Sequence, residues 1–255
     1  MSELTIDKVT LAFGGLTVLN DISFSVEAGE LLALIGPNGA GKTTVFNCIS
    51  GIYRPSGAIR FRDRDIVGLK PYEVAGLGIA RTFQHGELYG RMSVLDNLLT
   101  ARHLRIRTNV IGEILRLPST RSEERRHRDV ANQALHFVEL ERYRDTPVAD
   151  LPYGVQKLVG FARAIAAEPN VLLLDEPSAG LTREEREDFA HYILKIRDQL
   201  NIGMIWIEHD MQMVADLADR IHVLDYGKSL ADGRPEDVLR DPEVIRAYLG
   251  TQAGP

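Results

Sequence analysis

The segment GPNGAGKTT, residues 36–44, constrains the fold of this chain more than any other stretch of its sequence. It fits the pattern Gly-x-x-x-x-Gly-Lys-Ser/Thr and directly follows the apolar run LLALI, which is typical of a buried strand. Its glycines let successive backbone N–H groups turn toward one point, and a helix starting there directs its positive dipole end to the same point. The segment therefore predicts a phosphate-binding loop between a strand and a helix.

Each residue of this loop has a predicted part. Lys42 is expected to bridge the β- and γ-phosphates of a nucleoside triphosphate, and the Thr43 hydroxyl is expected to ligate Mg²⁺. The alternative is a glycine-rich turn with an accidental lysine, which the strand and helix on either side argue against. The predicted nucleotide-binding residues are Gly36, Pro37, Asn38, Gly39, Ala40, Gly41, Lys42, Thr43 and Thr44.

Three further segments supply candidate catalytic and metal-binding side chains. In VLLLDEP, four apolar residues end at Asp175, the predicted Mg²⁺ partner through water, and the next residue, Glu176, is the predicted general base for the attacking water. The apolar run in GMIWIEHD ends near His209, which is expected at the same sheet edge, where it would contact the γ-phosphate and hold the attacking water. Gln84 follows GIARTF, where its amide can reach metal and water. Taken alone, a strand-end His or a loop Gln would be structural or solvated.

The order of apolar patterns predicts an α/β fold. The first sixty residues contain short strand-like runs, and residues from about 93 to 149 show helical spacing of apolar positions. Beyond them helix and strand alternate, which favours a mainly parallel sheet covered on both faces. We therefore expect a nucleotide-binding core of residues 1–84 and 160–255, with a β-rich lobe, and a helical insert of residues 85–159.

Composition excludes some classes of protein. A net charge of −6 argues against broad nucleic-acid binding, which needs a basic face. The single cysteine, Cys48, cannot form an internal disulfide, which is typical of a reducing compartment such as the cytoplasm. No window has the run of about 18 apolar residues of a membrane span. If the protein acts at a membrane, we expect another protein to cross it.

In this order, the motifs resemble those of the ATP-binding subunit of an ABC transporter, and the resemblance covers residues 4–250. It implies an ABC cassette fold with an antiparallel β lobe, ATP and Mg²⁺ as cofactors, and ATP hydrolysis. Residues 36–44 would be the Walker A loop, Gln84 the Q-loop, VLLLDE the Walker B strand, Ser178 to Leu181 the D-loop and His209 the switch histidine. Phe13 stands where the family stacks an aromatic ring on adenine; the alternative is a core phenylalanine.

The family resemblance also gives LPYGVQ a role. In the family this signature segment opens a helix that faces the γ-phosphate held by a second subunit, so that two ATP molecules are sandwiched in a head-to-tail dimer. Here Pro152 replaces the usual serine and Val155 replaces a glutamine, while a proline is acceptable at a first helical position. Two alternatives remain: the segment acts through backbone N–H groups alone, or a paralogous subunit supplies the competent signature. The residues concerned are Leu151, Pro152, Tyr153, Gly154, Val155 and Gln156.

Within the family, the chain looks like the ATPase subunits of branched-chain amino acid importers. This likeness implies a second cassette, identical or paralogous, integral membrane permease subunits on which the insert docks, and indirectly a periplasmic or extracellular solute-binding protein. It implies a peripheral location at the cytoplasmic face of the inner membrane. Alternatives are a cassette for urea or small carboxylates, one for lipopolysaccharide export, or a soluble ABC ATPase of DNA repair or ribosomes. A small-molecule P-loop kinase would not explain the signature segment.

Overall fold

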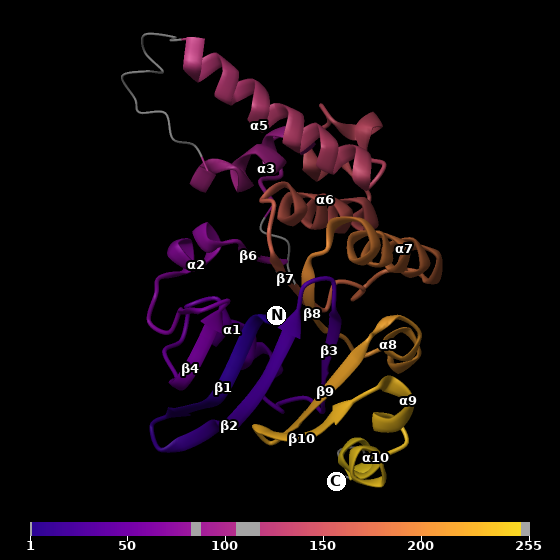
Figure 1. The fold of residues 1–255 in the computed structure, drawn as a ribbon. Helices are drawn as coiled ribbons and strands as arrows, with labels where there is room; N and C mark the ends of the chain where they lie inside the picture. The colour runs from indigo at the N-terminus through magenta and orange to yellow at the C-terminus, as the bar shows by residue number, and fades with distance from the viewer. Residues whose placement is uncertain (1, 83–87, 106–117, 251–255) are drawn as a thin grey trace.

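The computed structural model describes residues 2–82, 88–105 and 118–250, which form two β-sheets and the helices around them (Figure 1). The smaller sheet is antiparallel, in the order β2-β1-β4-β5. Its strands come from the N-terminal part of the chain, as the short strand-like runs there predict. They are β1 (Ser2–Phe13), β2 (Leu16–Glu27), β4 (Ser56–Phe61) and β5 (Arg64–Asp65).

The core sheet has the order β10-β9-β3-β8-β7-β6, and all neighbouring strands except β9 and β10 are parallel. Every residue of β3, β7 and β8 is buried, which explains why these strands are continuous apolar runs. The predicted mainly parallel sheet and the antiparallel lobe are thus confirmed. The strands are β3 (Leu31–Ile35), β6 (Ile79–Thr82), β7 (Val171–Asp175), β8 (Gly203–Ile207), β9 (Arg220–Asp225) and β10 (Lys228–Gly233).

Alternate residues of the core strands face two separate hydrophobic clusters. Leu32 and Leu34 pack with the β lobe and α1, whereas Leu31, Ala33 and Ile35 pack with helices on the opposite face. The sheet is therefore covered on both sides, as its apolar strands require. The covering helices are α1 (Lys42–Ile49) on one face and α7 (Arg183–Leu200), α8 (Met211–Leu217), α9 (Pro235–Val238) and α10 (Pro242–Gly250) on the other.

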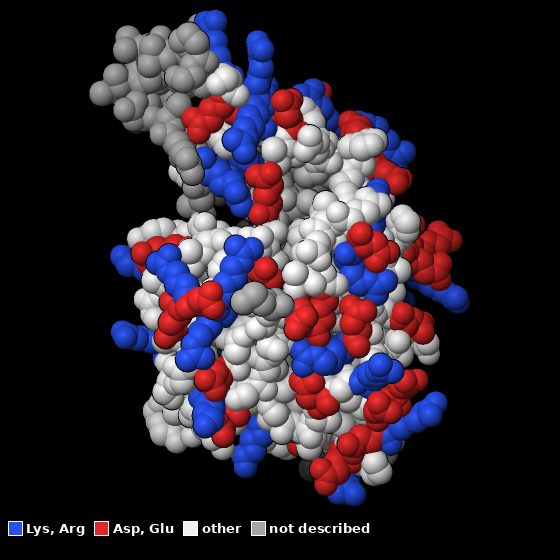
Figure 2. Space-filling model, in the orientation of Figure 1, with Lys and Arg blue, Asp and Glu red and all other residues white. Residues whose placement is uncertain are grey.

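A helical region lies beyond one end of the core sheet, at the top of Figure 1. Ser93 caps one of its helices by accepting a hydrogen bond from the Asp96 N–H at 3.1 Å. Basic side chains, several of them from the Arg-rich start of the longest helix, gather at the top of the face drawn in Figure 2, and over the core charges of both signs are interspersed. The helices of this region are α3 (Val94–Ala101), α5 (Pro118–Phe137) and α6 (Tyr153–Ala166), with the short 3₁₀ turns His103–Arg105, Glu141–Tyr143 and Val148–Asp150. Helix α2 (Pro71–Leu77) lies outside it and packs through Val74 into the cluster of the β lobe and α1.

Helix α6 joins this region to the core without interruption, because it runs from Tyr153 to Ala166 across the expected limit at residue 160. The exact limits of the two parts stay a prediction. In the part of the chain that the structure describes, no helix is long and apolar enough to span a membrane.

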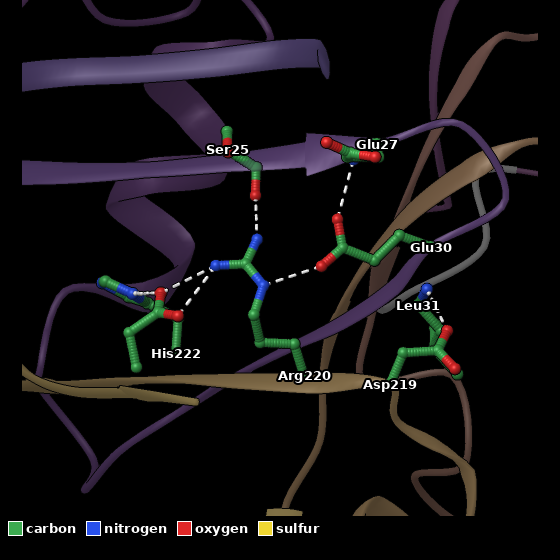
Figure 3. A network of polar contacts seen from close by, with 8 residues as sticks. Ser25, Glu27, Glu30, Leu31, Asp219, Arg220 and His222 are labelled. Atoms are coloured by element: carbon green, nitrogen blue, oxygen red, sulfur yellow. Dashed lines mark hydrogen bonds and ion pairs between the residues drawn. The ribbon is translucent and has the colours of Figure 1, made fainter. Parts of the chain in front are cut away.

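A network of charged side chains holds the β lobe and the C-terminal hairpin at the amino ends of the core strands (Figure 3). The Arg220 guanidinium donates to the carbonyl oxygen of Ser25, to Glu30 at 2.7 Å and to both carboxylate oxygens of Asp232 at 2.8 and 3.0 Å. The fully buried His222 contacts Asp232 through Nδ1 at 2.7 Å. One arginine thus joins β2, the start of β3, and β10.

Candidate nucleotide-binding site

The carboxyl ends of the parallel strands bring the predicted site residues to one edge of the core sheet. Asp175 at the end of β7 is paired with Ile207 at the end of β8, and Leu34 of β3 is paired with the same residue. The loop after β3, the acids after β7 and His209 after β8 therefore leave the sheet side by side. This is the edge where open α/β sheets bind ligands. Gln84 falls outside the described residues.

The glycine-rich loop is pressed against two neighbouring strands. A Cβ atom on Gly36, at φ 148°, would lie 2.0 Å from the carbonyl oxygen of Leu224 in β9. A Cβ atom on Gly41, at φ 106°, would lie 2.8 Å from a methyl group of Leu19 in β2. At Gly36 any other residue would collide with the backbone of β9, and at Gly41 the left-handed φ is unfavourable for any residue with a side chain. Helix α1 begins directly after Gly41, as the sequence pattern predicts.

Lys42 lies inside this loop and is almost fully buried. Its ammonium group donates hydrogen bonds to the carbonyl oxygens of Gly36 at 2.6 Å and Pro37 at 3.1 Å. Burial lowers the pKa of Lys42, and the nearby negative charges of Glu176 and Asp175 act in the opposite direction. The loop thus folds round a cation that faces the two acids.

Asp175 has a cationic partner that sequence reasoning missed. Arg81 of β6 pairs with it at 2.6 Å, and both side chains are buried. The same guanidinium donates to the Asn47 side chain of α1 at 2.8 Å. The arginine in the strand-like GIART was the feature of the sequence that could have predicted this pair, because a buried arginine needs an acidic partner. The pair fixes the orientation of the Asp175 carboxylate.

Glu176 and His209, the predicted base and switch histidine, contact each other directly. The distance from His209 Nε2 to Glu176 Oε1 is 2.9 Å. Glu176 has φ +47°, in the left-handed region that is unfavourable for a residue with a side chain, and its N–H donates to the carbonyl of Ile207 at 3.0 Å. The backbone strain and the contact together place the carboxylate beside the imidazole.

The C-terminal helix also reaches the loop, through a residue that sequence reasoning did not single out. The Tyr248 side chain makes a hydrogen bond with the backbone of Gly36. Burial raises the pKa of Tyr248 to about 12, although the bond to Gly36 acts in the opposite direction. The phenol is therefore neutral at physiological pH, and it ties α10 to the first residue of the loop.

The signature segment lies at the start of α6. Pro152 has φ −56° and ψ 150° and is the N-cap, so Tyr153 is the first helical residue. The extended ψ of Pro152 leaves it just outside the helix, where its missing N–H removes no helical hydrogen bond. The Gln156 side chain donates back to the carbonyl of Leu151 at 2.9 Å.

Gly154 has a packing role inside this chain. A Cβ atom there would lie 2.0 Å from Glu185 Oε1, on the first turn of α7. Tyr153 lies against Gly180 of the neighbouring loop and remains half exposed. The start of α6 is thus fitted closely to the start of α7, independently of any second subunit.

Phe13 is a surface residue at the end of β1. It is 46% exposed, so the alternative of a core phenylalanine was wrong. The edge of one ring packs against the other in the pair Phe13–Tyr53, with centroids 5.1 Å apart. An exposed aromatic ring on the β lobe is suited to stacking.

The glycine-rich loop, the strand-end acids and the helical region define the class of protein as a P-loop ATPase of the cassette type. A family model described as "ABC transporter" matches residues 19–179, and one described as "Branched-chain amino acid ATP-binding cassette transporter" matches residues 228–254. The chain belongs to the ABC transporter family and is an ATP-binding subunit with ATPase activity.

Individual relatives cover nearly all of the chain. It is 40% identical over 248 residues to the high-affinity branched-chain amino acid transport ATP-binding protein LivG of Salmonella typhimurium, with 97% of each chain covered. It is 34% identical over 251 residues to the lipopolysaccharide export system ATP-binding protein LptB of Escherichia coli, with 98% of each covered. The solved ADP conformation of MJ1267, an ATP-binding cassette of an ABC transporter, superimposes with a TM-score of 0.85 at 30% identity, covering 98% of this chain and 99% of the other.

Proposed function

We propose that this chain is the ATP-hydrolysing subunit of an importer for branched-chain or other amino acids, bound to the cytoplasmic face of the inner membrane through its permease. The observation that carries the import of amino acids is the similarity to LivG along the whole chain, together with the match of residues 228–254 to the branched-chain amino acid model. Hydrolysis itself is carried by the Glu176–His209 contact beside the Lys42 loop.

The site residues divide the chemistry of ATP hydrolysis among them. The loop and Lys42 would hold the β- and γ-phosphates, and Phe13 would stack on the adenine. Glu176 would accept a proton from the attacking water, and His209, in contact with Glu176, would hold that water in line with the γ-phosphate. Each of these steps requires a fixed geometry. The short distance between Glu176 and His209 at the sheet edge supports this proposal.

The donor groups fit Mg²⁺ that is held together with the phosphates. Within the described ranges no three His, Cys, Asp or Glu side chains gather into a metal site, and Mg²⁺ with substrate phosphates needs only one or two protein oxygens. Thr43 and Asp175 offer a hydroxyl and a carboxylate at the same edge, and Gln84 is the third proposed contributor. When bound, the ion would neutralise charge on the phosphates.

The partners follow from the fold and the relatives. A second cassette, identical or paralogous, would receive the signature residues 151–156 opposite its own ATP. A groove of about 330 Å³ between the core and the helical region offers a place for a permease segment; it is lined by Val74, Ile79, Arg81, Thr100, Arg105 and Ala164, among others. Its lining is mostly apolar and includes arginines, which is suited to a short amphipathic segment. A solute-binding protein would act indirectly, through the permease.

Reconstitution of the complete transporter tests this function. The chain would be purified with its permease and solute-binding protein, and ATP turnover in vesicles would be measured with leucine, isoleucine, valine, urea and short-chain dicarboxylates. We expect branched-chain amino acids to stimulate turnover through the binding protein. Stimulation by urea or carboxylates alone would contradict the proposed solute, and turnover that depends on lipopolysaccharide and no solute would indicate export.

A further inference from the structure

A buried carboxylate connects two of the loops that leave the catalytic edge. Glu208 follows β8 directly and is only 4% exposed. Its Oε2 accepts a hydrogen bond from the Ser178 hydroxyl at 2.6 Å, and its Oε1 accepts one from the backbone N–H of His209 at 2.8 Å. Ser178 is buried as well. Both oxygens of Glu208 are thus engaged between the segment after β7 and the segment after β8.

These contacts complete a closed ring of residues. Glu176 is joined by the chain through Pro177 to Ser178, Ser178 bonds to Glu208, and Glu208 is followed by His209. His209 returns to Glu176 at 2.9 Å and closes the ring. The ring contains Glu176 in its left-handed conformation, so the position of the proposed base and the position of the histidine depend on the same contacts.

Folding stability does not explain a carboxylate at this position. Among the residues that the structure describes, no lysine, arginine or histidine side chain forms an ion pair with Glu208. A buried carboxylate without a cation is costly, and an apolar side chain of similar volume would be buried at a lower cost. What an apolar side chain cannot do is hold a hydroxyl of one loop and an N–H of the other at once.

We propose that Glu208 is a positioning residue for ATP hydrolysis, which holds His209 against Glu176 by tying both to Ser178. This inference rests on the proposed roles of Glu176 and His209. Loss of Glu208 would let the imidazole move away from the γ-phosphate, and displacements of about 1 Å at a reacting centre cost up to ~10²-fold in rate.

Two substitutions in the full-length chain distinguish the effect of losing the two hydrogen bonds of Glu208 from the effect of losing its negative charge. In Glu208→Gln the amide oxygen can accept from the His209 N–H while the amide nitrogen donates to the Ser178 hydroxyl, so both links survive. Glu208→Leu has a similar volume and removes both links. At saturating Mg-ATP we expect kcat to fall by ~10-fold or more in Glu208→Leu and by less than about threefold in Glu208→Gln, with the Kd for ATP within about twofold of the wild type in both.

A second background distinguishes positioning from general damage. In His209→Ala the group to be positioned is absent, so adding Glu208→Leu should lower kcat by less than about twofold. A folded Glu208→Leu variant with wild-type kcat would overturn the proposal, as would the full ~10-fold loss persisting in the His209→Ala background. If Glu208→Leu does not fold, Ser178→Ala, which breaks one link of the ring, carries the same comparison.

A spectroscopic measurement makes the test independent of turnover. The side-chain NMR signal of His209, assigned by its loss in His209→Ala, should shift when Glu176→Gln is introduced into the wild type. The same substitution should leave the signal unchanged in the Glu208→Leu background, because the imidazole no longer lies against residue 176. An equal shift in both backgrounds would overturn the proposal, whereas absent turnover in the wild type would contradict only the proposed hydrolytic roles.

Discussion

Two groups of polar and charged side chains lie at opposite ends of the same, mainly parallel, core sheet and are built differently. At the amino ends, Arg220 donates to three acceptor residues on three segments, so its charge is paired within the network (Figure 3). At the carboxyl ends, Glu176 has a strained backbone, and the His209 side chain that it contacts is 44% exposed. The first group uses charge to join elements, and the second keeps polar groups available to a ligand at a cost in backbone strain.

This difference teaches which properties each end should control. The amino-end network should determine the free energy of unfolding, because its partners come from β2, β3, β9 and β10. The carboxyl-end group should determine turnover and contribute little to stability. Substitutions at the two ends can confirm or break this division.

The largest effect is expected from Glu176→Gln. It should slow ATP hydrolysis by ~10²-fold or more while ATP binding is retained, because the proposed general base is removed and the shape of the side chain is kept. ATP should then hold the chain in a stable dimer, detected by light scattering. Turnover of the partner-complete transporter is the measurement, and Glu236→Gln, on the exposed start of α9, is the matched control. Near-normal turnover of the Glu176→Gln variant would contradict the proposed role of Glu176 as general base.

A substitution at Gly154 could change both stability and turnover, because Gly154 belongs to the predicted signature segment and also packs against α7 inside this chain. Gly154→Ala should destabilise the fold by up to ~1 kcal/mol, since its Cβ would lie 2.0 Å from Glu185 Oε1 and would displace this carboxylate from its hydrogen bond with the Thr182 N–H. Urea unfolding measures the loss. The double variant Gly154→Ala, Glu185→Ala should lose less stability than the sum of the two single losses if the contact with Glu185 is the cause. Unchanged stability of Gly154→Ala would contradict the close fit between α6 and α7.

Arg220→Met tests the amino-end network. It should lower the free energy of unfolding by ~1–3 kcal/mol, because Glu30 and Asp232 lose their charged donor, while the Kd for ATP of the folded chain stays the same. The control is Arg62→Met, which breaks a more exposed pair with Glu3. A changed Kd for ATP would show that the two ends of the sheet are coupled, against the division proposed above.

The titration of Asp232 should contribute to the pH dependence of the free energy of unfolding. Burial would raise its pKa, but hydrogen bonds from His222 and Arg220 and their charges outweigh burial, so the pKa of Asp232 lies below its ordinary value of 3.8. The stabilisation is therefore present above about pH 4 and is lost as the pH falls through the lower folded pKa. Asp232→Asn should remove this part of the acid limb in urea unfolding at pH 2–7, and an unaltered limb would exclude the network as its source.

Pro152→Ser should have the smallest effect. A serine at an N-cap accepts a hydrogen bond from the first turn, which Pro152 cannot do, so thermal unfolding should shift upward by the equivalent of about 1 kcal/mol. If its hydroxyl also reaches the γ-phosphate of a second subunit, ATP-driven dimerisation should strengthen as well. A gain in stability without stronger dimerisation would assign the effect to the helix cap alone.

Much of the site could be predicted from the sequence because its residues follow strands that are themselves recognisable. Asp175 and His209 come at or just after apolar runs, and parallel strands of one sheet end at a common edge. The residues that were missed, Arg81, Glu208 and Tyr248, have no motif of their own. Their partners lie far away along the chain, and only packing brings them together.

The sequence by itself determined the fold class, the phosphate loop and the order of the functional segments, because local spacing of glycine, apolar and charged residues specifies strands, helices and turns. The tertiary structure alone decided which buried and partly buried polar groups meet: Arg81 with Asp175, Glu208 with Ser178, and Arg220 with Glu30 and Asp232. The physical reason is that a buried polar or charged group requires a partner. The sequence indicates which groups need one, but only the packing of distant segments decides which residue lies close enough to be that partner.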